Sequence, residues 1–189
     1  MSKKEDQNLI VGLDIGTSKV VVIVGEVGPD GTVDVVGIGS HPSRGLKKGV
    51  VVNIESTVQS IQRAVDEAER MAGCKIHSVY TGISGSHIRG LNSHGVTAIK
   101  NWEVTLEDVE RVIEAARVVA IPADQKILHI LPREFIIDGQ EGIQEPVGMA
   151  GVRLEVRVHI VTCAVSAEQN IVKCVQRCEL AVDDVILQQ

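Results

Sequence analysis

Residues 9–25, which read LIVGLDIGTSKVVVIVG, decide how this chain folds. Two apolar runs rich in β-branched residues stand on either side of a short polar segment, which is typical of two strands joined by a tight turn. The polar segment holds an acid, a glycine, two hydroxyl side chains and a lysine, namely Asp14, Gly16, Thr17, Ser18 and Lys19. This composition predicts a turn that can receive a phosphate group.

Each residue type of this turn has a chemical use beside a phosphate. Gly16 lets the backbone approach a ligand closely, and turn amides together with the Thr17 and Ser18 hydroxyls can donate to phosphate oxygens. Lys19 can supply a point charge, and Asp14 can hold Mg²⁺ through water. The alternative interpretation is an ordinary hairpin with a polar turn. The segment is not a Walker A motif, because its glycines enclose three residues instead of four.

The composition of the whole chain excludes several classes of protein. The chain has 189 residues, a net charge of −6 and a hydrophobic share of 44%, which fits a folded protein of one or two domains. Its few aromatic residues, Tyr80, Trp102 and Phe135, cannot provide base-stacking platforms, so we expect no nucleic-acid partner. The longest apolar run, residues 20–24, is too short for a membrane span, and the charged N-terminus is not a signal peptide. A cytoplasmic location is therefore predicted.

The residues after the opening hairpin predict an α/β layer. A hairpin turn at residues 28–31 leads to a third strand over residues 33–40. Apolar residues then recur at helical spacing over residues 54–72, and Asn53 suits the capping position at the start of this helix. A further strand over residues 76–83 crosses back to the sheet.

Residues 41–49, between the third strand and the helix, predict a basic loop. Its charged side chains are Arg44, Lys47 and Lys48. Two interpretations stay open, since the loop either faces a polyanion or an acidic partner, or simply carries solvated charge on a turn-rich segment.

The character of the sequence changes near residue 84. Residues 86–100 predict short extended segments interrupted by glycines, and a capping-box pattern from Thr105 to Asp108 opens a helix. The elements predicted next are a strand over residues 126–138, a loop over 139–151, a strand with one polar face over 152–161, a helix opened by a capping box at 166–169, and a strand over 182–187. The chain stops two residues later, which predicts a fragment of a longer protein.

Three blocks of sequence resemble, in order and spacing, the FtsA family of bacterial cell-division proteins. These are residues 9–19, residues 37–49 (GIGSHPSRGLKKG) and residues 141–153 (EGIQEPVGMAGVR). The resemblance runs essentially end to end. It implies an actin-like α/β fold of the ribonuclease H-like type, with a mixed sheet and an inserted subdomain of strands and one main helix. The implied parts are a flexible leader (1–8), an actin-like subdomain 1A (9–83 and 165–189) and an inserted subdomain 1C (84–164).

The same resemblance implies a scaffold of cell division. Members of the family are actin-like proteins that bind ATP with Mg²⁺, polymerise, recruit late division proteins, and tether the tubulin-like FtsZ ring to the cytoplasmic face of the inner membrane at the septum. Asp14, Gly16, Thr17, Ser18 and Lys19 would form the first phosphate-binding turn of the ATP site, with Asp14 holding Mg²⁺ through water. The other half of that site and the C-terminal membrane helix would lie outside this chain. We therefore expect the chain to bind ATP feebly and to hydrolyse none measurably.

Subdomain 1C carries the remaining partners that the resemblance implies. In the family it takes part in contact between protomers and binds the basic cytoplasmic tail of FtsN, whereas FtsZ docks on a region outside this chain. The acids expected to face a basic tail are Glu103, Glu107, Asp108, Glu110 and Glu114. Two alternatives share the actin-like fold: a small-molecule kinase, which has the same Asp-x-Gly-Thr turn, and a pilus-assembly adaptor.

Overall fold

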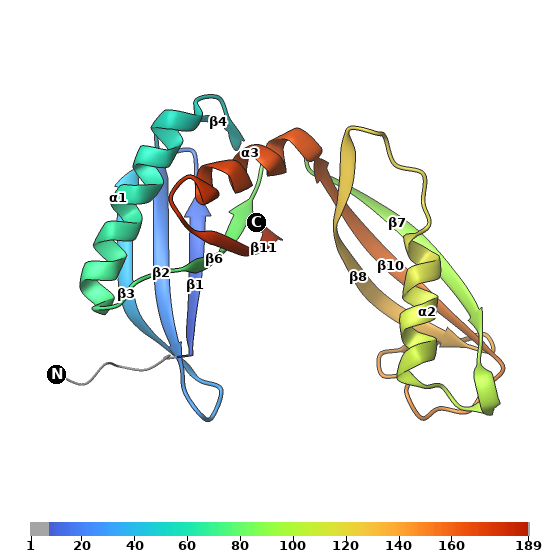
Figure 1. Cartoon of the computed structure of the whole chain (residues 1–189). Helices are drawn as coiled ribbons and strands as arrows, with labels where there is room; N and C mark the ends of the chain where they lie inside the picture. The colour runs from blue at the N-terminus through green and yellow to red at the C-terminus, as the bar shows by residue number, and fades with distance from the viewer. Residues whose placement is uncertain (1–7, 189) are drawn as a thin grey trace. The chain divides into compact units, whose positions relative to one another are not determined.

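The computed structural model describes residues 8–188 and divides them into two compact units. Unit 1 contains the residues up to His87 together with those from Val165 onward, and unit 2 contains Ile88–Ala164 (Figure 1). The first junction therefore lies between residues 87 and 88, four residues later than the sequence suggests, and the second lies between residues 164 and 165. Of the predicted flexible leader, residues 1–7 lie outside the described residues.

Unit 1 is built on a five-stranded sheet in the order β11-β6-β1-β2-β3. Its strands are β1 (Leu9–Ile15), β2 (Lys19–Val27), β3 (Val33–Pro42), β6 (Ser78–Ile83) and β11 (Ala181–Leu187). β1, β2 and β3 pair antiparallel through the two predicted turns, whereas β6 runs parallel to both β1 and β11. The sheet is mixed, as the sequence predicts, because a crossover helix separates β3 from β6.

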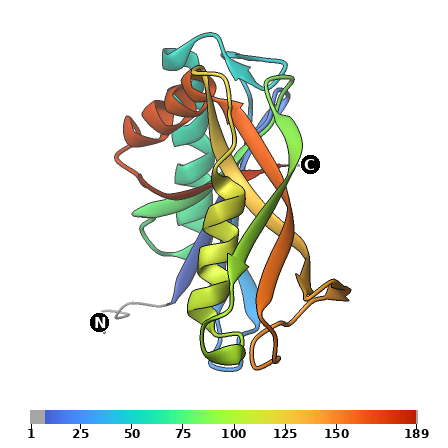
Figure 2. The same cartoon turned by 90° about the vertical axis from the view of Figure 1, so that its right-hand side faces the viewer.

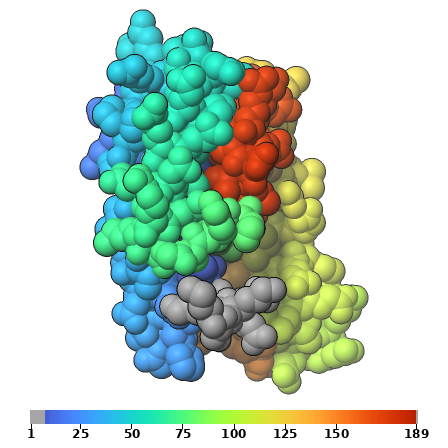
Figure 3. Space-filling view, turned by 60° about the vertical axis from the view of Figure 1, so that its left-hand side comes forward, coloured from blue at the N-terminus to red at the C-terminus, as the bar shows by residue number. Residues whose placement is uncertain are grey.

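Two helices, α1 (Ile54–Ala72) and α3 (Val165–Gln176), lie side by side against one face of this sheet (Figures 1 and 3). The Asn53 side chain accepts a hydrogen bond from the Ser56 amide at 2.9 Å, and Gly73 ends α1 in the left-handed conformation, so both predicted ends are confirmed. Gly39 lets α1 pack directly on β3, because a side chain there would collide with the Ala64 carbonyl.

The structure corrects two predictions for unit 1. The segment 41–49 is not a simple loop, since β4 (Leu46–Lys47) pairs antiparallel with β5 (Val50–Val51) in a small hairpin. The last helix begins at Val165 directly after a strand, so Ser166 lies inside its first turn and is not the capping residue that the sequence predicts. Capping-box patterns are local, whereas the start of this helix follows from the strand that runs into it.

Unit 2 is a four-stranded antiparallel sheet in the order β7-β10-β8-β9, with α2 (Leu106–Arg117) lying across one face (Figure 2). The strands are β7 (Arg89–Ala98), β8 (Gln125–Ile137), β9 (Gln140–Ile143) and β10 (Arg153–Ala164), and a short helical turn, η1 (Lys100–Trp102), precedes α2. Leu154, Val156 and Val158 of β10 pack against Val112 and Ala116 of α2 in the core. The other face of β10 carries polar residues, as its alternating sequence predicts.

The structure also corrects two predictions for unit 2. Residues 89–98 form one continuous strand paired with β10 over its whole length, not short interrupted segments. The turn-rich stretch 139–151 contains β9, which pairs with β8 at Phe135 and Ile137. The predicted strand over residues 126–138 is irregular, because the register between β8 and β10 shifts next to Pro132.

Candidate functional site

The turn between β1 and β2 is tight and presents its tip to solvent. The Gly16 amide donates to the Lys19 carbonyl at 3.0 Å and closes the turn. Thr17 and Ser18 form the exposed tip, and within residues 8–188 neither of their amides donates a backbone hydrogen bond. A side chain at position 16 would lie 2.8 Å from the Lys19 carbonyl oxygen, so the turn requires glycine there. Two amides and two hydroxyls are therefore available to an anion at this tip.

Residues 43–49 hold the same turn in place through two hydrogen bonds. The Gly49 amide donates to Thr17 Oγ1 at 3.3 Å, and the Ser43 amide donates to the Ser18 carbonyl at 3.0 Å. These contacts fix the tip without using its amides. A turn held in this way loses little conformational entropy when a ligand binds, which is the advantage of preorganisation.

A cavity of about 510 Å³ opens beside the turn in unit 1. Asp14 and Lys19 line it, whereas Gly16, Thr17 and Ser18 lie next to it and are not part of its lining. The remaining lining comes from β1, β2, β6 and the end of β11: Gly12, Leu13, Val21, Ile23, Tyr80, Thr81, Gly82, Ile186, Leu187 and Gln188. The turn thus stands at the polar rim of a cavity whose other walls are largely apolar, a common form for a ligand pocket.

Two buried oxygens at this cavity lack a hydrogen-bond partner within residues 8–188, namely Asp14 Oδ1 and Thr81 Oγ1. A buried acceptor without a partner costs free energy, so such atoms are uncommon in a folded protein. Carboxylate oxygens are preferred neighbours of Mg²⁺ and its bound waters. Asp14 therefore fits the role that the resemblance assigns to it.

The sequence identifies the turn but misses the opposite walls of the cavity. Tyr80 and Gly82 face it because β6 lies parallel to β1, with Gly12 next to Tyr80 in the register. Gln188 reaches it because β11 adds to the far side of β6. Strand pairing between segments about 70 residues apart leaves no local signal, although the predicted strand over residues 76–83 made such a neighbour possible.

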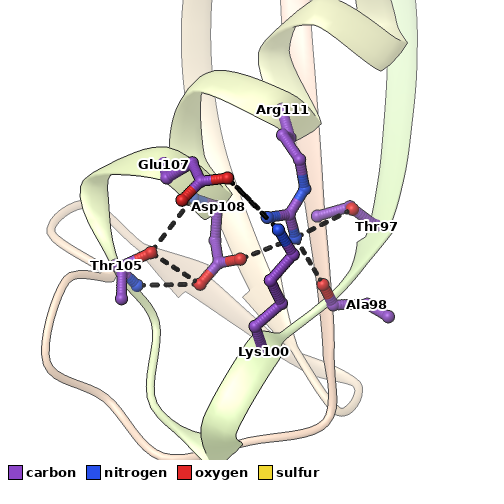
Figure 4. Close-up of polar contacts among 7 residues, drawn as sticks. All are labelled: Thr97, Ala98, Lys100, Thr105, Glu107, Asp108 and Arg111. Atoms are coloured by element: carbon purple, nitrogen blue, oxygen red, sulfur yellow. Dashed lines mark hydrogen bonds and ion pairs between the residues drawn. The ribbon is translucent and has the colours of Figure 1, made fainter.

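The acids predicted to face a basic partner lie around α2, and the structure separates them into two kinds. Asp108 is 0% exposed. Its Oδ2 accepts from the Thr105 amide at 3.0 Å and the Thr105 hydroxyl at 2.9 Å, and its Oδ1 pairs with Arg111 Nη2 at 2.6 Å (Figure 4). The amide of Thr105, followed by its hydroxyl and by Arg111, lowers the pKa of Asp108 in spite of burial. Asp108 caps α2 and is not available to a partner.

The other four acids are exposed. Glu107 pairs with Lys100 at 3.2 Å and more loosely with Arg111 at 3.8 Å (Figure 4), and Glu114 pairs with Arg117 at 3.4 Å. Glu103 and Glu110 are exposed and form no ion pair within residues 8–188. Exposed pairs of this kind contribute little stability, so these side chains can exchange partners readily.

Arg111 links this cap to the rest of unit 2. Besides its contact with Asp108, its Nη2 donates to the Ala98 carbonyl at 2.7 Å at the end of β7 (Figure 4). Trp102, which is 72% exposed, lies in the connection between β7 and α2, and the Gly151 amide donates to its carbonyl at 3.0 Å. Arg111 therefore joins the first turn of α2 to the end of β7.

Similarity to known proteins first shows to which fold class the chain belongs. The structure is similar to a solved structure titled PilM-PilN type IV pilus biogenesis complex, with a TM-score of 0.64 and 16% identity, over 94% of this chain and 47% of that one. Residues 85–162 match the family model described as the SHS2 domain inserted in FTSA. The chain thus has an actin-like α/β fold with an inserted SHS2 unit, and the fold class predicted from the sequence is confirmed.

The relatives in sequence define the family. The chain is 67% identical to the cell division protein FtsA of Pseudomonas aeruginosa over all 189 residues, 53% identical to that of Neisseria meningitidis over 185 residues, and 50% identical to that of Escherichia coli over 186 residues. The chain belongs to the FtsA family. It spans about 45% of the length of these relatives, covering 45%, 45% and 44% of them respectively. No helix within residues 8–188 is long and apolar enough to cross a membrane.

Proposed function

We propose that this protein acts in bacterial cell division as an actin-like, ATP-binding scaffold that anchors the FtsZ ring to the cytoplasmic membrane and recruits late division proteins. The observation that carries the proposal is identity of 50% or more with proteins named cell division protein FtsA, extending over essentially the whole chain. The pilus complex is similar only in fold, at 16% identity, so it does not favour a pilus adaptor. The relatives compared above carry the name cell division protein FtsA, which does not favour a small-molecule kinase.

ATP is proposed to bind with its terminal phosphates at the turn between β1 and β2. The unpaired amides of Thr17 and Ser18 and the hydroxyl hydrogens of both residues would donate to phosphate oxygens, and Lys19 at the rim of the cavity would contribute positive charge. Asp14, whose buried oxygen has no partner within residues 8–188, would hold Mg²⁺ through water. The ion would neutralise phosphate charge and orient the triphosphate.

Nucleotide is proposed to regulate conformation rather than to drive rapid turnover. Within residues 8–188 the turn offers no evident general base beside the expected phosphates, because Asp14 is assigned to the metal and Lys19 to charge compensation. The chain spans about 45% of the length of the Pseudomonas aeruginosa relative, and the resemblance implies that the other half of the ATP site lies outside this chain. Binding by the chain alone is therefore expected to be feeble.

Unit 2 is proposed to contact other division proteins and neighbouring protomers of the polymer. Glu103 and Glu110, together with Glu107 and Glu114 after release of their exposed partners, would attract a basic tail such as that of FtsN. Asp108 is left out of this surface because it is buried in the cap of α2. FtsZ and the membrane, at the cytoplasmic face of the septum, would be contacted by other parts of the full-length protein.

Exchange of segments tests the division role directly. This chain would replace the matching 189 residues of the Pseudomonas aeruginosa protein in cells depleted of their own FtsA. We expect the hybrid to restore septation, and the same hybrid with Asp14→Ala to restore it poorly at equal protein level. Filamentous cells in spite of a normally accumulated hybrid would contradict the proposed function.

Calorimetric titration with Mg-ATP tests the nucleotide site separately. The hybrid should bind saturably and lose at least tenfold in affinity on Asp14→Asn, while the isolated chain should bind weakly. Micromolar affinity of the isolated chain would show that the second lobe is dispensable. Unchanged affinity of the Asp14→Asn hybrid would remove Asp14 from the site.

A further inference from the structure

A second cavity in unit 1 has a lining that consists entirely of hydrogen-bonding side chains and contains no acid. It measures about 260 Å³ and lies between the end of β3 and the first half of α1. Its lining residues are His41, Arg44, Ser56, Gln59, Ser60 and Arg63. None of them belongs to the candidate nucleotide site.

The backbone that presents Arg44 is held firmly against α1. The Arg44 amide donates to Ser60 Oγ at 3.2 Å, and its carbonyl accepts from Thr57 Oγ1 at 3.3 Å. The next residue, Gly45, has φ +90° and lies so close to Asn53 that a side chain would collide with the Asn53 carbonyl. Its own carbonyl accepts from the amides of Val52 and Asn53, at 2.7 and 3.1 Å. The cavity wall is thus rigid before any ligand arrives.

The two arginines carry charge that nothing in the described chain neutralises. Within residues 8–188 neither the Arg44 nor the Arg63 guanidinium forms an ion pair or a hydrogen bond. Three acids of α1 lie near them in the sequence, but each faces another group. Glu55 pairs with Arg177 at 3.1 Å, Glu67 accepts from the Ser40 amide at 2.8 Å, and Asp66 lines a different cavity together with Lys75. Two unpaired guanidinium groups on one preformed cavity favour a compact, multiply charged anion.

We infer that this cavity, the Arg44–Arg63 pocket, binds a phosphate group. Guanidinium presents two parallel N–H donors that match the oxygens of phosphate, and the Ser56 hydroxyl and Gln59 amide on the same side of α1 add neutral donors. Of the lining residues on α1, Ser56 lies in the first turn, where the helix dipole is positive. Either a free phosphate or the headgroup of an anionic phospholipid presents this chemistry.

The test compares two double variants of the 189-residue chain that each remove two positive charges. Arg44→Gln with Arg63→Gln removes the charge inside the pocket, and Lys47→Gln with Lys48→Gln removes it from the same loop outside the lining. Inorganic phosphate is titrated by calorimetry and by amide chemical shifts, and sedimentation with phosphatidylglycerol vesicles is compared with phosphatidylcholine vesicles. Arg63→Lys, which keeps the charge but loses the paired donors, is a third variant that preserves the fold.

We expect the pocket variant to bind at least tenfold more weakly, Arg63→Lys to be intermediate, and the loop variant to stay within about twofold of the parent. Saturable phosphate binding without vesicle binding assigns a free phosphate. Vesicle binding that phosphate competes away, and that the pocket variant loses, assigns a lipid headgroup. Equal weakening by both double variants, or no saturable binding of either probe, overturns the inference. These outcomes do not involve Asp14 or division, so they are independent of the proposed function.

Discussion

Asp14 in unit 1 and Asp108 in unit 2 are both acids that the sequence places at functional positions, yet their surroundings are opposite. One oxygen of Asp14 is buried without a partner within residues 8–188. Asp108 is completely buried but receives the amide and hydroxyl of Thr105 and the guanidinium of Arg111. The first is an acceptor that the fold of residues 8–188 leaves without a partner, and the second is already used by the fold. The partners of a carboxylate, more than its place in a motif, separate binding from structure.

The largest expected effect comes from Asp108→Ala, which removes the N3 half of the capping box of α2 and leaves Arg111 without its buried partner. Loss of a cap costs about 1 kcal/mol, and an unsatisfied partner adds a similar amount, so we expect the free energy of unfolding to fall by about 2 kcal/mol. Urea unfolding followed by the fluorescence of Trp102, which is the sole tryptophan and lies in unit 2, measures this change.

The matched control for this variant is Glu110→Ala on the exposed side of the same helix. Glu110 forms no ion pair within residues 8–188, so its removal should change the free energy of unfolding by no more than about 0.5 kcal/mol. Equal effects of the two variants would show that the cap seen at Asp108 contributes nothing specific.

Lowering the pH is expected to reduce the free energy of unfolding by a somewhat smaller amount than Asp108→Ala does. Hydrogen bonds from Thr105 and the charge of Arg111 lower the pKa of Asp108 in the folded state, while the unfolded value is about 3.9. The ionised carboxylate therefore stabilises the fold fully above the unfolded pKa, and this contribution is lost as pH falls through the folded pKa. The difference in unfolding free energy between the parent and Asp108→Asn should be constant near pH 7 and should shrink below about pH 4.

Subtracting the unfolding free energy of Asp108→Asn from that of the parent isolates the contribution of Asp108. Glu69 and Glu134 also have lowered pKa values, through the Ile76 amide with Lys75 and through Arg157 respectively, but they are present in both proteins and cancel. If this difference in unfolding free energy stays constant down to about pH 2, the charge of Asp108 does not contribute to stability.

Asp14→Asn should not destabilise the fold, in contrast to Asp108→Ala. Because one oxygen of Asp14 is buried without a partner, replacing the charge by a neutral amide relieves a desolvation cost. We expect the free energy of unfolding to stay constant or to rise by up to about 1 kcal/mol, measured by thermal unfolding of the ligand-free chain. A loss of more than about 1 kcal/mol would indicate a structural partner and would place Asp14 in the same class as Asp108.

Much of the fold could be predicted because its signals are local. The helix cap at Asn53, the stop at Gly73 and the cap of α2 at Thr105 each depend on residues within one turn of each other. The two hairpin turns of unit 1 could be predicted as well, because glycine, proline and acidic residues stand between runs of β-branched residues. Asp14 and Lys19 were proposed for the same reason, since the residues of the turn are consecutive, and both line the cavity beside it.

What could not be predicted depends on contacts between distant segments. Gly95 reads as a strand breaker, but it lies in the middle of β7 because α2 packs there so closely that a side chain would come within 2.9 Å of Ala116 Cβ. The apolar walls that Tyr80 and Gly82 add to the cavity depend on β6 lying next to β1. The burial of Asp108 did leave a signal, because positions 108, 112 and 116 share one face of the helix.

The smallest expected effect is that of Glu107→Gln, one residue before Asp108. Glu107 is 68% exposed, and its pairs with Lys100 and Arg111 are open to water, so we expect unfolding free energy to change by less than about 0.5 kcal/mol. The weakness of these pairs is what frees Glu107 for a basic partner, and titration with a basic peptide should show about twofold weaker binding to the variant. Asp108 and Glu107 are adjacent acids, so a large loss of stability from Glu107→Gln would show that exposure does not separate the two kinds of carboxylate.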